Sequence, residues 1–212
     1  MVLPSTPMKK ESVSEQLRSL LAKRALILGQ ITLSSGTVSD HYFDCKRVTL
    51  NSEGASLVGE AVLNAIVKLP ETPQAIGGLT HGADPIISAV MMRARERGIH
   101  LDGFYVRKEP KNHGTKNYIE NAPPRGSRVV VVDDVVTLGG SVLKAVDMVE
   151  REGCEVLAVI TIVDRLEGGG EKIRARVRKY IPLYTLDDFR YELESCHRDM
   201  MKSALLSAEV SR

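Results

Sequence analysis

Residues 128–141 constrain the fold of this chain more than any other stretch. They read Arg-Val-Val-Val-Val-Asp-Asp-Val-Val-Thr-Leu-Gly-Gly-Ser. The run Val129–Val132 is β-branched without a break, which is typical of a strand buried on both faces of a parallel sheet. Apolar residues at helical spacing begin directly after Ser141. We therefore expect a buried strand that ends at Asp133 and Asp134, then a glycine loop, then a helix.

This order predicts a ligand site. In open α/β sheets, ligands bind beyond the carboxyl ends of the strands. A glycine-rich turn at a helix start presents backbone N–H groups, which suit a phosphate. Two carboxylates cannot favour the same phosphate, so Asp133 and Asp134 are expected to meet sugar hydroxyls or a metal carried by the ligand. The stretch alone therefore indicates a phosphorylated sugar.

Helical and strand patterns alternate along the rest of the chain. A helix is expected from Ser12 to about Leu28, where Gly29 stops it, and a hairpin is expected over residues 31–44. Further strands are expected at 75–79, 101–106, 156–163 and 180–185. Further helices are expected at 51–68, at 84–98 with Asp84 as N-cap, and from Asp187 or Asp188. Residues 168–170 are expected to form a turn. The alternation predicts an α/β fold, a doubly wound and mainly parallel sheet flanked by helices, with a small N-terminal hairpin or hood.

The length of 212 residues suits one α/β domain with a sizeable core. We expect residues 1–10 to be disordered and residues 11–212 to form one domain. Within it, residues 11–50 should supply a helix and the hood, and residues 51–195 the α/β core. The segment after about Ser195 receives no predicted role.

Composition excludes several classes of protein. The chain has 29 basic and 27 acidic residues, so its net charge of +2 gives no whole-protein argument for nucleic acid. No apolar run approaches the roughly 18 to 20 residues of a membrane span. Three widely separated cysteines argue against a disulfide framework and favour a reducing cytoplasm. The P-loop, dinucleotide and HExxH motifs are all missing, and no direct protein ligands for a metal are expected.

Residues 107–126 interrupt the alternation. A loop of this length inside a compact domain is usually a lid or a binding loop. It carries Arg107, Lys108, Lys111 and His113. Such a loop can close over a polyanionic leaving group, exclude water and reopen for product.

Four segments resemble one enzyme family. The acidic pair with Thr-x-Gly-Gly-Ser resembles the ribose-5-phosphate loop of type I phosphoribosyltransferases. Residues 107–114, Arg-Lys-Glu-Pro-Lys-Asn-His-Gly, resemble the catalytic loop R-K-x-x-K-x-H-G of orotate phosphoribosyltransferases. Residues 32–43 are similar to the base-binding hairpin of that family, and Val163-Asp164-Arg165 to the strand end whose arginine meets orotate. The resemblance covers about residues 25–185 and implies the type I phosphoribosyltransferase fold.

The resemblance also implies a reaction. The 5-phosphoribosyl group of phosphoribosyl pyrophosphate (PRPP) would pass to orotate, giving orotidine 5′-monophosphate and pyrophosphate in de novo pyrimidine (UMP) biosynthesis. The implied catalytic residues are Lys111, His113, Asp133 and Asp134. The implied PRPP-binding residues are Arg107, Lys108, Lys111, His113, Asp133, Asp134, Val135, Val136, Thr137, Leu138, Gly139, Gly140 and Ser141. The implied orotate-binding residues are Tyr42, Phe43, Thr137 and Arg165, and an arginine suits the orotate carboxylate because its planar fork can pair with both oxygens.

The family further implies a Mg²⁺ ion carried by the donor, small-molecule substrates, and a homodimer whose active sites are shared. We expect a cytoplasmic enzyme with no nucleic-acid or membrane partner. Two alternatives remain: a purine phosphoribosyltransferase, and a non-catalytic regulator that senses PRPP. Arg165 argues against the first, because purines lack a carboxylate. The lysine and histidine of the loop argue against the second.

The chain departs from the family pattern at two places. Many members carry lysine where Ser34 stands, and many carry another in the loop around Gly82. We expect Lys46 or Arg47 to supply part of the missing positive charge. His81 is expected either to line the site or to cap the following helix.

Overall fold

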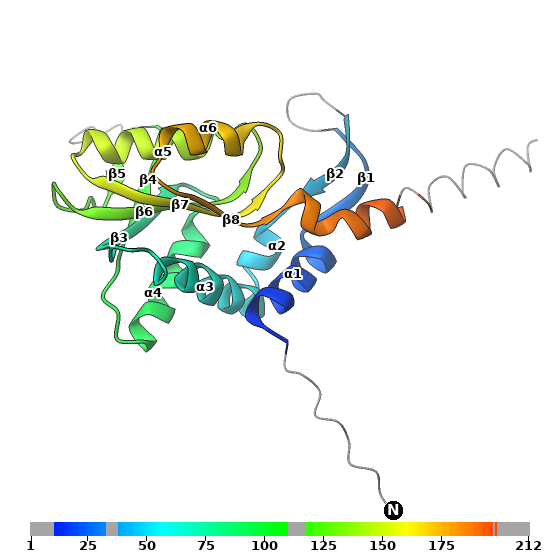
Figure 1. Cartoon of the computed structure of the whole chain (residues 1–212), viewed down its shortest axis with the longest axis horizontal. Coiled ribbons are helices and arrows are strands. Elements are labelled where there is room, and N and C mark those ends of the chain that lie inside the picture. The colour runs from blue at the N-terminus through cyan, green and yellow to red at the C-terminus, as the bar shows by residue number, and fades with distance from the viewer. Residues whose placement is uncertain (1–10, 33–37, 110–117, 197, 199–212) are drawn as a thin grey trace, which may run out of the picture.

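The computed structural model describes residues 11–32, 38–109, 118–196 and 198 (Figure 1). Four expectations lie outside these residues: the disorder of residues 1–10, the environment of Ser34, the positions of Lys111 and His113, and the end of the chain after residue 198. None of the helices in the described part of the chain is both long and apolar enough to cross a membrane.

A six-stranded, mainly parallel sheet forms the centre of the described structure, which confirms the predicted fold class. Its strand order is β5-β4-β3-β6-β7-β8, and only the short edge strand β5 pairs antiparallel. The strands are β3 (Ala75–Leu79), β4 (Asp102–Val106), β5 (Ile119–Glu120), β6 (Arg128–Val136), β7 (Glu155–Asp164) and β8 (Tyr180–Thr185).

Helices cover both faces of this sheet (Figure 1). The helices α3 (Ser52–Ile66) and α4 (Asp84–Glu96) lie on one face, and α5 (Gly140–Arg151) and α6 (Gly169–Arg176) on the other. The valines of β6 divide accordingly. Val130 and Val132 pack into the core with α3 and α4, while Val129 and Val131 pack into the core with α5. An unbroken apolar run is needed because both faces of the strand are buried.

The N-terminal helix ends earlier than its apolar pattern predicts. Helix α1 (Val13–Arg24) begins with a capping box between Ser12 and Glu15. The expected continuation to Leu28 is wrong, because Leu26–Thr32 form strand β1, which pairs antiparallel with β2 (Val38–Phe43). Gly29, at φ +122°, lies in the irregular part of this pairing and does not end a helix. Cross-strand pairing thus outweighed the helical spacing of the side chains.

Three smaller boundaries also differ from expectation. Strand β6 runs to Val136, so the acidic pair lies inside the strand and not after it. Residues 168–170 are not only a turn, because α6 begins at Gly169, and Gly168 at φ +89° precedes it. The single buried apolar side chain of α6, Ile173, explains why no helical period was visible. Asp84 is the first helical residue of α4, and Ala83 takes the cap position.

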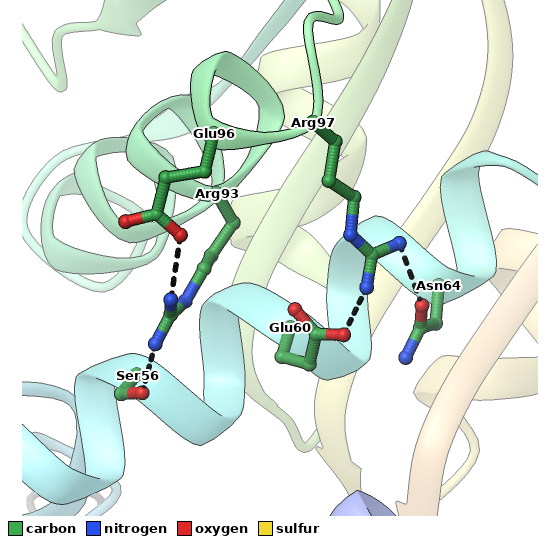
Figure 2. A network of polar contacts seen from close by, with 6 residues as sticks. All are labelled: Ser56, Glu60, Asn64, Arg93, Glu96 and Arg97. Carbon is green, nitrogen blue, oxygen red and sulfur yellow. Dashed lines mark hydrogen bonds and ion pairs between the residues drawn. The ribbon is translucent and has the colours of Figure 1, made fainter.

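The helices α3 and α4 are joined by a polar network on their outer surface (Figure 2). Arg93 bonds to Ser56 on α3 and to Glu96 on its own helix, and Arg97 bonds to Glu60 and Asn64. Beneath it the two backbones touch. A Cβ added at Gly59 would lie 2.7 Å from the carbonyl oxygen of Ala89. The pair therefore packs as one layer under the sheet.

The remaining elements lie beside the sheet. Helix α2 (Lys46–Thr49) follows the β1–β2 hairpin, and a 3-10 turn (Leu186–Phe189) follows β8 and leads into a helix from residue 190. The expected C-terminal helix is thus present, and the 3-10 turn starts one residue before Asp187. Arg18 of α1 pairs with Glu192, which ties the two ends of the described chain together.

Candidate active site

Asp133 and Asp134 lie near the carboxyl end of β6, buried to 6% and 9% exposure. Each carboxylate accepts a hydrogen bond from the backbone amide of the next residue. The amide of Asp134 donates to Asp133 Oδ1 (3.0 Å), and the amide of Val135 donates to Asp134 Oδ1 (2.9 Å). Burial, and then the neighbouring charge of Asp134, raise the pKa of Asp133 to about 8. The pair is therefore held at the sheet edge with a shortage of positive partners.

Lys46 supplies positive charge to this pair. Its Nζ lies 3.4 Å from Asp134 Oδ2, and its pKa is raised chiefly by that carboxylate and also by the nearby Tyr42 hydroxyl. Arg47 instead pairs with Asp44 (3.3 Å), and its side chain is 58% exposed. Of the two residues expected to provide the missing charge, the structure therefore places Lys46 at the acidic pair.

A cleft of about 230 Å³ opens above the acidic pair. Its walls are formed by Lys46, Leu79, Thr80, His81, Gly82, Lys108, Asp133, Asp134, Val135 and Ser141. Gly82 lies against both carboxylates, because a Cβ there would stand 2.5 Å from Asp133 Oδ1 and 2.6 Å from Asp134 Oδ1. His81 lines the cleft, which agrees with one of its two expectations. It does not cap α4, whose N-terminus has no side-chain cap hydrogen bond, and its Nδ1 instead lies 3.4 Å from Asp84 Oδ2.

The predicted phosphate loop connects β6 to α5. Gly139 adopts φ +79° and precedes the first residue of α5, so Thr137–Ser141 form a sharp turn at a helix N-terminus. The amide of Gly169 donates to the carbonyl of Thr137 (3.0 Å), and a Cβ on Gly169 would lie 2.7 Å from the nitrogen of Gly139. Only glycines allow this close approach of two loops. The side chain of Val136 is buried, and that of Leu138 is exposed.

Arg165 follows β7 directly beside this loop. Its amide donates to the carbonyl of Val136 (2.9 Å), and its guanidinium pairs with Glu167 (2.8 Å). The residue is only 4% exposed, yet its Nε is buried without a hydrogen-bond partner among the described residues. A buried donor without an acceptor is costly, so this unsatisfied Nε needs an explanation.

The aromatic residues of the hairpin have separate environments. Tyr42 is 37% exposed, and it lies near Lys46, which lines the cleft. Phe43 is 3% exposed, and its ring centroid lies 5.0 Å from that of Phe189. The expectation that Phe43 covers a pyrimidine is wrong, since its position at the inner face of β2 places it in the core.

The first residues of the predicted lid are described. Arg107 pairs with Glu120 on β5 (2.7 Å), and Lys108 lines the cleft while its carbonyl accepts from the Lys144 ammonium. Lys111 and His113 lie outside the described residues. The structure therefore brings together the acidic pair, the phosphate loop, Arg165 and Lys108, and it holds Arg107 on an ion pair beside them.

Comparison with known proteins decides the family. A family model for the phosphoribosyl transferase domain matches residues 48–183. The orotate phosphoribosyltransferase of Rhodopirellula baltica is 41% identical over 87% of this chain and all of its own length. The corresponding enzyme of Streptomyces coelicolor is 46% identical over 76% of this chain and 88% of its own. The chain belongs to the orotate phosphoribosyltransferase family.

A solved structure of the same family contains a ligand. Mycobacterium tuberculosis orotate phosphoribosyltransferase in complex with PRPP matches with a TM-score of 0.70 at 34% identity, over 84% of this chain and 98% of that one. The alternation of strands and helices, the loop at Thr137–Ser141 and the arginine after β7 thus stand in the fold of an orotate phosphoribosyltransferase.

Some residues of this orotate phosphoribosyltransferase site were not predicted from the sequence. Three contacts there join residues far apart in the chain. They are the contact of Gly82 with the acidic pair, the bond from Lys144 to Lys108, and the bond from Tyr180 to Asp164, the residue before Arg165. Lys144 had one signal, since it lies one helical turn after Gly140 and Ser141 at the loop. The contacts of Gly82 and Tyr180 had no such signal, because a glycine or tyrosine outside a motif does not indicate its spatial partner.

Proposed function

We propose that this chain catalyses the transfer of the 5-phosphoribosyl group from PRPP to orotate, giving orotidine 5′-monophosphate and pyrophosphate in the pathway to UMP. One observation carries the proposal. Arg165, with its buried and unsatisfied Nε, donates its amide to the carbonyl of Val136, between the acidic pair and the phosphate loop. A donor for an acidic base and a cradle for a sugar phosphate are thereby adjacent.

The donor is proposed to lie along the end of β6. Its 5-phosphate would take the backbone amides and hydroxyls of Thr137–Ser141, where the positive end of the α5 dipole favours an anion. Its ribose hydroxyls would donate to Asp133 and Asp134. As the bond to pyrophosphate breaks, positive charge grows on the ribose, and a fixed carboxylate pair stabilises that charge more than the ground state.

The acceptor is proposed to be orotate because Arg165 can bind its carboxylate. One terminal nitrogen of the guanidinium pairs with Glu167, and Nε has no hydrogen-bond partner among the described residues. A purine would give this donor no carboxylate, so the purine phosphoribosyltransferase alternative leaves it unsatisfied. A nitrogen of the bound orotate would attack the anomeric carbon, and Tyr42 would lie beside the base at the cleft edge.

The leaving pyrophosphate is proposed to meet positive charge from Lys46, Lys108 and the lid residues Lys111 and His113. Lys46 and Lys108 line the cleft. Lys111 and His113 would neutralise or protonate the pyrophosphate, with Arg107 as a further donor-binding residue. A non-catalytic regulator would have little use for such groups.

Magnesium is proposed to arrive with the donor. Within the described residues, no three histidine, cysteine or acidic side chains converge on one point. Mg²⁺ usually keeps several waters and binds through substrate phosphates and few protein carboxylates, so it would be carried by the donor and its waters. When bound, the ion would supply charge neutralisation to the pyrophosphate.

We further propose a homodimer in which each lid completes the neighbouring site, one domain over residues 11–212, and a cytoplasmic location. The dimer rests on the family. The location is supported by three free thiols, two of them buried, which are typical of a reducing compartment.

Orotate consumption tests the proposal. The absorbance of orotate is followed with PRPP and Mg²⁺, and adenine, hypoxanthine and uracil are offered as competing acceptors. Orotate should be consumed and the three other bases should not. Folded protein that binds PRPP without consuming any base would instead favour the regulator, and consumption of a purine would favour the second enzyme.

A further inference from the structure

A chain of buried hydrogen bonds lies beneath the loop that carries Arg165. Asp164, the last residue of β7, is fully buried, and its Oδ2 accepts from the Tyr180 hydroxyl at 3.1 Å. The same hydroxyl oxygen lies 3.0 Å from Thr161 Oγ1. A phenol has one hydrogen, which goes to the carboxylate, so Thr161 must donate to Tyr180. The bonds therefore run in one direction, from Thr161 through Tyr180 to Asp164.

The other oxygen of Asp164 holds the backbone of the Arg165 loop. Asp164 Oδ1 accepts from the amide of Leu166 at 2.9 Å. Leu166 adopts φ +59°, in the left-handed region that residues with a side chain rarely occupy, and it is 42% exposed. Its side chain is thus not held by burial. The conformation at Leu166 depends on the bond to Asp164, as in an aspartate-stabilised turn.

This turn decides the position of the guanidinium. Leu166 stands between Arg165 and Glu167, whose side chains form an ion pair (2.8 Å), so the backbone conformation at Leu166 sets how these two side chains meet. Farther along, a Cβ at Gly170 would stand 2.1 Å from Asp164 Oδ2, so the start of α6 closes tightly over the same carboxylate. The Asp164 carboxylate is therefore enclosed by the loop that it organises.

Tyr180 is well suited to fix this carboxylate. Burial raises the pKa of the Tyr180 phenol well above its usual range, so the hydroxyl keeps its hydrogen. The Arg174 guanidinium covers the ring, 5.1 Å from its centroid. Of the hydrogen bonds described to the Asp164 carboxylate, one comes from the amide of Leu166 in its own loop and the other from Tyr180 on the neighbouring strand β8.

We propose that Tyr180 is a positioning residue for the acceptor base: through Asp164 it holds the Arg165 loop in the conformation that binds the carboxylate of an acidic pyrimidine. The inference rests on the proposed function. Tyr180 does not contact the base. It acts on the base through Arg165. Its effect on the donor should be smaller, because the phosphate loop joins β6 to α5 and, among its described contacts, only that with Gly169 comes from the side of Asp164.

Tyr184 offers a matched control. It lies on the same strand, and its hydroxyl donates to the carbonyl of Ser14 at 2.8 Å. Tyr184→Phe therefore removes a comparable partly buried hydroxyl that points toward α1 and away from Asp164. Thr161→Val provides a second probe, since it removes the far end of the same bond chain and keeps the side-chain shape.

The experiment measures the KM for orotate, the KM for PRPP and kcat for the wild type and the three variants. It also measures amide hydrogen exchange of residues 165–168. Tyr180→Phe should raise the KM for orotate about tenfold, since one lost charge-assisted bond is typically of that size. Thr161→Val should raise it about threefold, because its bond to the phenol is neutral and weaker. The KM for PRPP should stay within about twofold, and exchange of residues 165–168 should quicken in both.

Tyr184→Phe should leave the KM for orotate and this exchange unchanged. An unchanged KM for orotate in Tyr180→Phe and Thr161→Val would overturn the inference, while orotate consumption by the wild type would uphold the proposed function. Equal rises in both KM values would also overturn it, because they would indicate general destabilisation. If Tyr180→Phe does not fold, Thr161→Val decides. If the wild type consumes no orotate, the proposed function fails, and the exchange of residues 165–168 alone decides whether Tyr180 holds the loop.

Discussion

Lys46 reaches from α2 to Asp134 on β6, across 88 positions of sequence, with 3.4 Å between Nζ and Oδ2. The contact links the element after the β1–β2 hairpin to the sheet edge where the ribose is proposed to bind. It gives the acidic pair a positive partner from a residue that also lines the cleft. The Lys46 ammonium is thus placed so that a ligand phosphate in the cleft can replace Asp134 as its partner.

Replacement of Lys46 should weaken donor binding. Lys46→Met removes the charge and keeps the length of the side chain, so the KM for PRPP should rise about tenfold through the loss of one partly exposed phosphate contact. Arg47→Met is the control, because Arg47 pairs with Asp44 and is largely exposed. Steady-state kinetics at fixed saturating orotate measure both variants. Equal KM values for PRPP in Lys46→Met and the wild type would contradict the proposed role.

The raised pKa of Asp133 makes stability depend on pH in a defined direction. The folded carboxyl titrates near pH 8 and the unfolded one near its ordinary 3.8. The folded state therefore binds the extra proton between these values, and stability falls as the pH rises from about 4 to 8. Asp133→Asn removes this pH-dependent loss of folding stability, because asparagine does not titrate. Its melting temperature should exceed that of the wild type by about 5 °C at pH 8.5.

At pH 4 the two melting temperatures should converge, because Asp133 is then protonated in the folded wild type. The same variant should lose activity about 100-fold, a size typical of one lost electrostatic contact in a transition state. Calorimetry from pH 4 to 9 checks the stability. A difference between the two proteins that grows toward low pH would show that the sign is wrong.

Arg165 should determine the choice of acceptor. Arg165→Gln should lower kcat/KM for orotate about 100-fold, because a charge-assisted contact with the orotate carboxylate is lost. The KM for PRPP should change little. Arg178→Gln is the control, since that side chain is 65% exposed and pairs with Glu155 at the opposite end of β7. A parallel loss of PRPP affinity would mean that Arg165 acts on the loop and not on the base.

Shared active sites predict complementation between two inactive variants. Lys111→Ala damages the lid, and the double change Asp133→Asn/Asp134→Asn damages the ribose site. In a heterodimer with crossed lids, one site carries both defects and the other carries none. Random reassortment should then restore roughly a quarter of wild-type activity. Mass spectrometry verifies the heterodimers, and no recovery in them would place each lid over its own site.

Several features were determined by the sequence alone. The valine run of β6, the acidic pair and the glycine loop are local patterns, and each residue type there can satisfy only a narrow set of environments. The same holds for Arg165, whose place at a strand end follows from the apolar run before it. These local patterns were sufficient for the fold class and for three parts of the candidate site.

Tertiary structure decided the rest, because it depends on contacts between distant residues. Leu28 fits a helix by spacing, but pairing with β2 made it part of a strand. Phe43 looked like a base-covering aromatic, but Phe189, far along the chain, drew it into the core. Lys46 became the partner of Asp134, and Tyr180 that of Asp164, only once the sheet had formed. Local pattern specifies which groups are available, and packing specifies which of them meet.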